Sequence, residues 1–195
     1  THYRSALQLY QYMTDNNISN RYSMVADCHC LLGNHHKVIE MLTSIGEKSH
    51  GEYHILGITY RRLGKYKAAE IFLSEALQIA FNNTSAEKLA DYYGNPLTTD
   101  AMMENKTDDL KVEPSPEQRL GMIHNVSPDV IVYLLGLGDV YNDQKQYFIA
   151  EEYYMKCLQF IYELHGEGAA VRSAAVTLNN LGSIYDNMGE YNKAI

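Results

Sequence analysis

The 195-residue sequence predicts an all-α protein, an α-solenoid of stacked antiparallel helix pairs interrupted by a Pro-containing insertion. Two observations predict this class: one helix-pair pattern recurs along the chain, and all four prolines fall between Pro96 and Pro128. The composition agrees, because 46% hydrophobic and 21% charged residues are typical of a folded soluble domain. No apolar run approaches the roughly 18 residues that a membrane helix needs, so we expect no membrane insertion.

The helix-pair pattern occupies four segments that align without gaps, 22–45, 53–76, 134–157 and 178–195. Three residues after each start, an apolar residue precedes a small one, at Val25-Ala26, Leu56-Gly57, Leu137-Gly138 and Leu181-Gly182. An aromatic residue or His follows three positions later, at His29, Tyr60, Tyr141 and Tyr185. A turn residue then stands at Gly33, Gly64, Lys145 and Gly189. The second half carries another small or apolar residue, at Val38, Ala69, Ala150 and Ala194.

This spacing predicts two antiparallel amphipathic helices in each segment. Residues at i, i+3, i+4 and i+7 share one helix face, so each half has an apolar side. The small residues let the two helices approach closely, and the aromatic rings fill the space on either side of that approach. Gly between the halves tolerates the left-handed backbone that ends a helix. Because one pair cannot bury both of its faces, the pairs must stack on their neighbours.

The spacing L-G-x-x-Y, with Gly and Tyr in the turn and Ala nine residues after the first Tyr, resembles the tetratricopeptide repeat (TPR) family. The fit is close in 53–76 and 134–157, shortened in 178–195 and weaker in 22–45, where Val38 replaces the usual Ala. The matching segments cover about half of the chain. The resemblance implies a TPR superhelix that binds partner segments in its concave groove.

Repeat spacing differs between the two halves of the chain. Val25 and Leu56 are 31 residues apart, near the usual TPR period of about 34. Leu137 and Leu181 are 44 residues apart, and the run 177–182 resembles the 42–44-residue repeats of kinesin light chains. We therefore expect longer helices in the C-terminal half.

The pattern divides the chain into three parts. We expect an N-terminal sub-array over 1–93, an insertion or linker over 94–128 and a C-terminal sub-array over 129–195. In the first part, 3–13 is interpreted as the second helix of an earlier repeat and 85–93 as a degenerate unit. We expect both ends of the sequence to be cut within the array.

The Pro-containing insertion is interpreted as a solvated linker without a regulatory role. An alternative is proline-directed phosphorylation at Ser115-Pro116 and Ser127-Pro128, which would add charge and order or release this segment.

Motifs for metal binding and catalysis are weak. Cys28-His29-Cys30 followed by His35-His36 has zinc-ligand chemistry, but the two cysteines point to different faces of a helix. We interpret these residues as core and turn positions and expect no metal or other cofactor. The sequence has no G-x-S-x-G, no phosphate-cradling Gly loop and no H-E-x-x-H, so we expect no enzyme.

A basic cluster lies at one place in the chain, formed by Arg61, Arg62, Lys65 and Lys67. Cations are favourable near the C-terminus of a helix, which is the simpler interpretation. The alternative is a contact with an anion or acidic peptide, since the TPR resemblance places the Arg61 position on the concave wall. Because the formal charge of the chain is −8, we expect no nucleic-acid binding.

The TPR resemblance also assigns peptide-binding positions to the first helix of each pair. Carried over, these positions give a candidate groove formed by Arg61, Asp139, Asn142, Asp143, Asn179, Asn180, Ser183, Asp186 and Asn187. Asn suits this role because its amide both donates to and accepts from a peptide backbone. Ordinary helix-surface polarity is the alternative. A chaperone-tail clamp is not expected, because only Asn180 fits its pattern.

We therefore predict a non-enzymatic scaffold that binds a protein or peptide segment in the groove. Acidic groove residues favour a basic partner segment. The alternatives are a regulatory or targeting array of a larger enzyme, and a subunit-packing module of a large assembly. Three Cys and the lack of a signal peptide favour a cytoplasmic location.

Overall fold

The computed structural model describes residues 8, 22–82, 129–165, 172–190, 192 and 193. These residues form helices, and no strand occurs among them. They fall into two compact units that divide between Ala76 and Leu77. The prediction of an all-α chain of packed helix pairs is confirmed.

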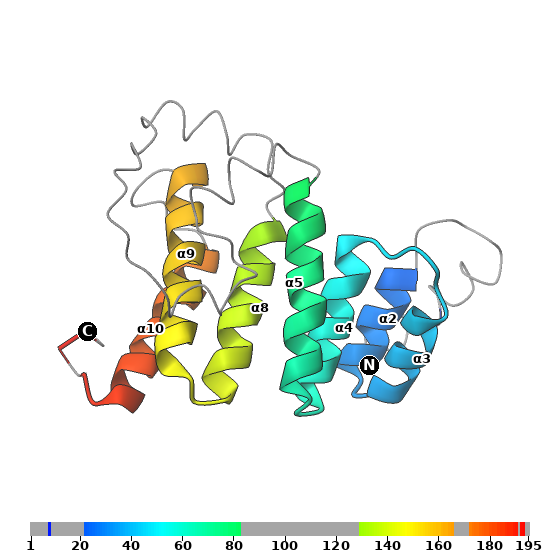
Figure 1. Ribbon diagram of the computed structural model, residues 1–195, viewed down its shortest axis with the longest axis horizontal. Coiled ribbons are helices and arrows are strands. Elements are labelled where there is room, and N and C mark those ends of the chain that lie inside the picture. Colours follow the sequence, from blue (N-terminus) through cyan, green and yellow to red (C-terminus); the bar gives the residue numbers. More distant parts are fainter. Residues whose placement is uncertain (1–7, 9–21, 83–128, 166–171, 191, 194–195) are drawn as a thin grey trace, which may run out of the picture. The chain divides into compact units, whose positions relative to one another are not determined.

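The first unit contains α2 (Tyr22–Leu31), α3 (His35–Thr43), α4 (His50–Arg62) and most of α5 (Tyr66–Asn82) (Figure 1). The second unit contains α8 (Asp129–Asp143), α9 (Tyr147–His165) and α10 (Arg172–Met188). Compared position by position, the C-terminal helices are longer, as expected. The first helices α8 and α10 have 15 and 17 residues, against 10 in α2 and 13 in α4. The second helix α9 has 19 residues, against 9 in α3 and 17 in α5.

Several expectations fall outside the described residues and stay predictions. They concern the helix of an earlier repeat at 3–13, the degenerate unit at 85–93, the insertion at 94–128 and the two Ser-Pro sites within it.

One turn geometry ends the first helix of all four pairs. A residue one or two positions after the helix has a left-handed backbone, with φ of 78° at Gly33, 69° at Gly64, 61° at Lys145 and 76° at Gly189. The next backbone N–H then donates to the carbonyl five residues earlier, in the pairs Asn34–His29, Lys65–Tyr60, Gln146–Tyr141 and Glu190–Tyr185. This is the Schellman arrangement, which satisfies carbonyls that the helix end leaves open. The predicted turn is therefore confirmed, and Lys145 adopts it without being Gly.

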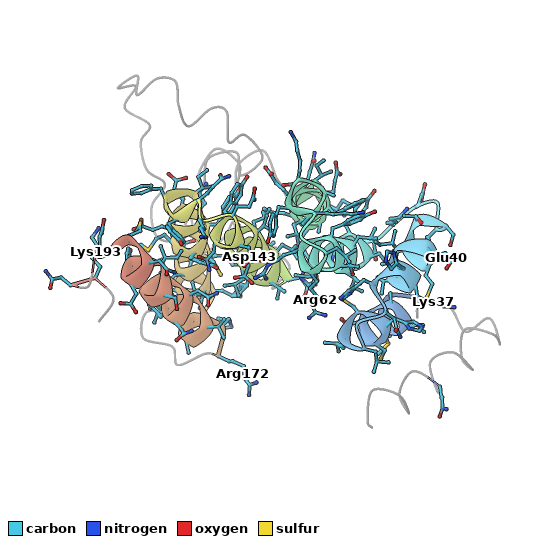
Figure 2. All side chains as sticks on the ribbon, turned by 90° about the horizontal axis from the view of Figure 1, so that it is seen from below. Lys37, Glu40, Arg62, Asp143, Arg172 and Lys193 are labelled. Carbon is cyan, nitrogen blue, oxygen red and sulfur yellow. The ribbon has the colours of Figure 1, made fainter. Side chains whose placement is uncertain are left out.

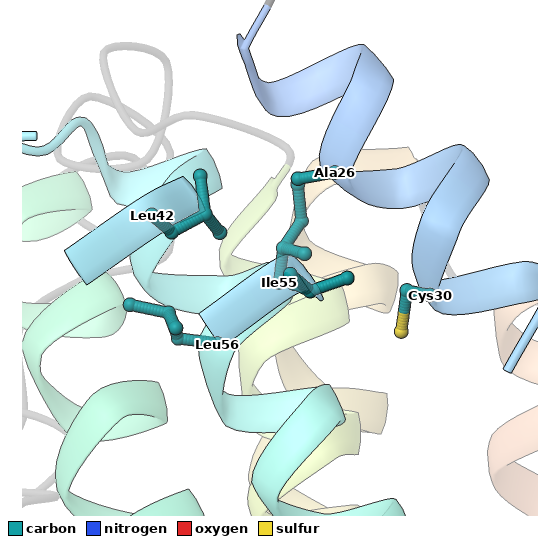
Figure 3. Close-up of a cluster of buried hydrophobic side chains, with 6 residues drawn as sticks. Ala26, Cys30, Leu42, Ile55 and Leu56 are labelled. Carbon is teal, nitrogen blue, oxygen red and sulfur yellow. The ribbon is translucent and has the colours of Figure 1, made fainter. Parts of the chain in front are cut away.

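The core of the first unit lies where α2, α3 and α4 meet (Figure 3). Ala26, Leu42 and Leu56 are fully buried there, and Cys30 and Ile55 are nearly so. The Tyr60 ring stacks on Phe72 of α5, with ring centroids 5.2 Å apart. These contacts place the predicted apolar and aromatic positions on the inner faces of the helices.

Two glycines mark the closest approach within a helix pair. A Cβ atom on Gly57 would lie 2.5 Å from Cγ of Leu73, and one on Gly138 would lie 2.5 Å from Cε1 of Tyr154. Real Cβ atoms essentially never come within 3.0 Å of such neighbours. The small residue that the repeat pattern predicts is therefore required at both positions.

In the second unit α9 packs against both α8 and α10 (Figure 1). Cys157 of α9 is fully buried, and its Sγ lies 3.5 Å from the carbonyl oxygen of Ile131 and 3.6 Å from Oγ1 of Thr177. One side chain of α9 thus contacts both neighbouring helices.

Candidate functional site

The structure separates the nine candidate groove residues into two groups. Arg61 lies in the last turn of α4, in the first unit. The other eight lie on α8 and α10, in the second unit. On α10, four of them are exposed, at Asn179, Ser183, Asp186 and Asn187. Asp143, the last residue of α8, is also exposed, whereas Asp139, Asn142 and Asn180 are half-buried.

A hydrogen-bonded cluster joins α8, α9 and α10. The Tyr154 hydroxyl of α9 donates to Oδ1 of Asp139 on α8 at 2.6 Å. Nδ2 of Asn180 on α10 donates to the same oxygen at 3.1 Å. The Tyr154 side chain is fully buried, so its hydroxyl needs a protein acceptor. We call these three residues the Asp139 clasp.

The Asp139 clasp gives two of the candidate groove residues a structural contact. Asp139 and Asn180 are 41 residues apart and belong to successive helix pairs, so their bond links one repeat to the next. A charged acceptor strengthens both hydrogen bonds. Asn180 is thereby held in one orientation, with its amide nitrogen turned toward α8.

A row of exposed and half-buried side chains runs along α8 and α10. Positions on the two helices correspond at an offset of 44 residues, so Val132 corresponds to Val176 and Asp143 to Asn187. We call this row the α8–α10 strip, formed by Val132, Leu135, Asp139, Asn142, Asp143, Val176, Asn179, Asn180, Ser183, Asp186 and Asn187. Asp143 lies at the end of α8, and Arg172 lies at the beginning of α10 (Figure 2).

Most of the polar α10 side chains in the strip make no hydrogen bond to another helix that the structure describes. The Ser183 hydroxyl donates within the helix, to the carbonyl oxygen of Asn179 at 3.0 Å. The side chains of Asn179, Asp186 and Asn187 make no hydrogen bond or ion pair with any residue that the structure describes. A row of exposed amide and carboxylate groups is therefore available on this helix.

In the first unit the basic cluster has a structural contact that the sequence did not predict. Nη1 of Arg62 donates to the carbonyl oxygen of Cys30 at 2.8 Å, which ties the end of α4 to the end of α2. Partial burial raises the pKa of Asp27 above its ordinary value, and the positive charge of Arg62 opposes that shift. The helix-terminus interpretation of the cluster fits Arg61 and Arg62, which both lie in the last turn of α4.

The cysteines are free thiols in buried positions. Cys30 accepts hydrogen bonds at its sulfur from Thr59 at 3.4 Å and Arg62 at 3.3 Å. Burial raises the pKa of Cys28 and raises that of Cys157 to about 11. Within the described ranges, no three His, Cys, Asp or Glu side chains are grouped so as to hold a metal ion.

Two buried or half-buried tyrosine hydroxyls were missed by the sequence interpretation, which treated the rings as packing material. Besides Tyr154, the Tyr185 hydroxyl of α10 donates to Oε1 of Glu151 on α9 at 2.7 Å. Burial, followed by the Glu151 carboxylate, raises the pKa of Tyr185 to about 12. A signal was present, because Tyr154 stands where the other repeats carry Leu42 and Leu73, and a hydroxyl in a core needs a partner.

Comparison with known proteins finds tetratricopeptide repeats in this chain. One model of the tetratricopeptide repeat matches residues 53–83 and 175–195, and a second matches residues 130–168. These segments are tetratricopeptide repeats, as their residue pattern predicts. Such repeats generally mediate protein–protein interaction and are typically non-catalytic.

A solved structure shares the fold. The crystal structure of BtubC (BKLC) from P. vanneervenii matches with a TM-score of 0.60 and 18% sequence identity, over 99% of this chain. The chain spans 66% of the length of that protein. At this identity the likeness establishes the fold alone. A search of the curated proteins found no match.

None of the described helices is both long enough and apolar enough to cross a bilayer.

Proposed function

We propose that this chain is a non-enzymatic scaffold that binds a segment of a partner protein along the α8–α10 strip. The observation that carries this proposal is the exposed row of Asn179, Asp186 and Asn187, whose side chains the packing of the described helices does not use. The Asp139 clasp supports it, because it holds α8 and α10 together beneath that row.

Amide side chains fit this task chemically. A partner segment that lacks regular structure presents backbone N–H and C=O groups, and each Asn amide both donates and accepts. Asn180 meets such a segment already oriented by Asp139, so less side-chain entropy is lost on binding. A cytoplasmic location is part of the proposal, supported by the free thiols of Cys28, Cys30 and Cys157.

The outer face of α9 supports a second role, as a packing surface in a larger assembly. Phe148 is 74% exposed and Met155, seven residues later, is 49% exposed. Residues seven apart share a helix face, and large apolar side chains at such a face are typical of subunit contacts. In this alternative the partner covers Phe148 and Met155 and leaves the α8–α10 strip exposed.

The experiment is a selection of displayed random peptides on the whole chain, followed by binding measurements on synthetic copies of the selected peptides. The test variant combines Asn179→Ala, Ser183→Ala and Asn187→Ala, all at exposed positions. The matched control combines Glu152→Ala and Gln159→Ala, at exposed positions of α9.

We expect the selected peptides to bind the strip variant about tenfold more weakly than the wild type, and the control with unchanged affinity. Equal affinity for the strip variant, or no enriched peptide, would contradict binding along the strip. Loss of affinity on Phe148→Ser with Met155→Ser instead would favour the assembly role.

A further inference from the structure

We propose that the α8–α10 strip recognises a two-part motif, an aliphatic residue and a Lys or Arg about five residues away in an extended peptide. The aliphatic residue lies against Val132 and Val176, and the cation lies near Asp143 and Asp186. This inference rests on the proposed binding along the strip and adds the chemistry of the partner.

The apolar end of the strip is repeated on both helices. Val132 is 44% exposed and Val176, its counterpart 44 residues later, is 45% exposed. Leu135 lies one turn beyond Val132 and is half-buried. An aliphatic side chain that covers these residues removes apolar surface from water, which contributes about 25 cal/mol for each Å² buried.

The other end of the strip carries negative charge. Asp143 is the last residue of α8, and Asp186 lies in the last turn of α10. The C-terminus of a helix adds a partial negative charge of its own. A partner Lys or Arg is the group that complements this end.

The apolar and acidic ends lie at a fixed distance. Val132 and Asp143 are eleven residues apart, which is three helical turns, so both side chains share one face of α8. At about 1.5 Å per residue the separation is about 16 Å, and an extended chain covers that length in about five residues. A partner that satisfies both ends must therefore keep this spacing.

The Asp139 clasp lies between the two ends. Asp139 and Asn180 hydrogen-bond across α8 and α10 at 3.1 Å, so the two helices cannot slide past each other without breaking that bond. The paired valines and the two carboxylates are thereby kept in one register. Recognition of spacing depends on this rigidity.

The test uses the whole chain and synthetic peptides with a Ser, Gly and Gln background, each carrying one Leu and one pair of adjacent Lys. Peptides with the Leu and the Lys pair about two, about five and about nine residues apart are compared by fluorescence anisotropy at low and high salt. We expect the middle spacing to bind about tenfold more tightly, and salt to weaken it.

Variants of the chain test the acidic end and the apolar end of the α8–α10 strip separately. Asp143→Lys with Asp186→Lys is expected to lose the Lys peptide and to bind the same peptide with Glu in place of Lys. Val132→Ser with Val176→Ser is expected to lose the preference for Leu over Ser and to keep the salt dependence. Glu40→Lys with Glu152→Lys, at exposed positions of α3 and α9, changes the net charge by the same amount and is the control that should change neither.

The outcomes separate the two proposals. If peptides bind in a manner that depends on Asn179, Ser183 and Asn187 but show no preference for spacing, Leu or Lys, the two-part motif is wrong and the scaffold role stands. If no peptide binding depends on these residues, both fail.

Discussion

The two units of this chain build the same helix pair from different side chains. In the first unit the residue facing Gly57 is Leu73, and in the second the residue facing Gly138 is Tyr154. Leu73 and Tyr154 are both fully buried. Only the tyrosine carries a polar group into the core, and that group bonds to Asp139, which in turn binds the next helix pair. In the second unit the packing residue therefore also takes part in a hydrogen-bonded link between successive repeats.

The units differ again where the first helix of a pair ends. The last two residues of α4 are Arg61 and Arg62, whereas the last two of α8 are Asn142 and Asp143. Arg62 is used to join α4 to α2. A shared backbone geometry thus ends in basic residues in one unit and in an amide and a carboxylate in the other.

The greatest loss of stability is expected on truncating Tyr154 or Leu73, the side chains that face Gly138 and Gly57. Tyr154→Ala should lower the free energy of unfolding by about 4 kcal/mol and Leu73→Ala by about 3 kcal/mol, because both leave cavities in a closed core. Tyr154→Phe, which keeps the ring, should cost about 1 kcal/mol for the lost hydrogen bond. Hydrogen exchange followed separately in α8–α10 and α2–α4 measures each effect, and a Tyr154→Phe loss as large as that of Tyr154→Ala would contradict the packing argument.

The next effect comes from adding a methyl group at the close approach. Gly138→Ala should destabilise by about 2 kcal/mol, because the rigid ring of Tyr154 must move. Gly57→Ala should cost less, since Leu73 can change rotamer more easily than a ring. Gly46→Ala is the control, as nothing lies within 4 Å of its added Cβ, and chemical denaturation should show no loss for it.

A smaller effect concerns the turn after α8. Lys145 holds φ of 61°, where the first unit has Gly64 at 69°. Lys145→Gly should stabilise the second unit by about 1 kcal/mol by removing the strain on a side-chain-bearing residue, and Gly64→Lys should destabilise the first unit by about as much. Equal melting temperatures for Lys145→Gly and the wild type would show that the turn is not strained.

The smallest effect is a pH dependence confined to the first unit. Burial, followed by the charge of Lys37, lowers the pKa of His29 below its ordinary value of 6.5. The unfolded chain then binds more protons than the folded one, so stability is full above about pH 6.5 and falls as the pH drops below it. Nδ2 of Asn34 lies 3.2 Å from Nδ1 of His29, and it can donate only while that nitrogen is unprotonated.

Opening free energies from hydrogen exchange, corrected for intrinsic rates at about pH 7.5 and about pH 5.5, measure this difference. We expect α2 and α3 to lose protection at the lower pH and α8–α10 to change less, since the one described His of the second unit, His165, is exposed. His29→Gln should remove the extra loss in α2. If the His29→Gln variant loses as much protection in α2 at the lower pH as the wild type does, a group other than His29 causes the effect.

The fold was predictable because its causes are local. Small residues such as Gly57 and Gly138 recur at one place in each pair, and a left-handed residue follows the first helix each time. Both features depend on neighbours within one helix pair, where sequence spacing translates directly into contact. The predicted exposed positions at Asn179 and Asn187 follow from the same periodicity.

The helix pair, its turn and the residues on each helix face therefore follow from the order of residues along the chain. The hydrogen bond between Asp139 and Asn180, which are 41 residues apart, and the bond from Arg62 to the carbonyl of Cys30 depend on tertiary packing. These contacts depend on how one helix pair is rotated and shifted against the next. The spacing of residues within a pair does not specify that arrangement. For that reason the sequence placed Asp139 and Asn180 among the residues for a partner, and the structure also places them in the joint between repeats.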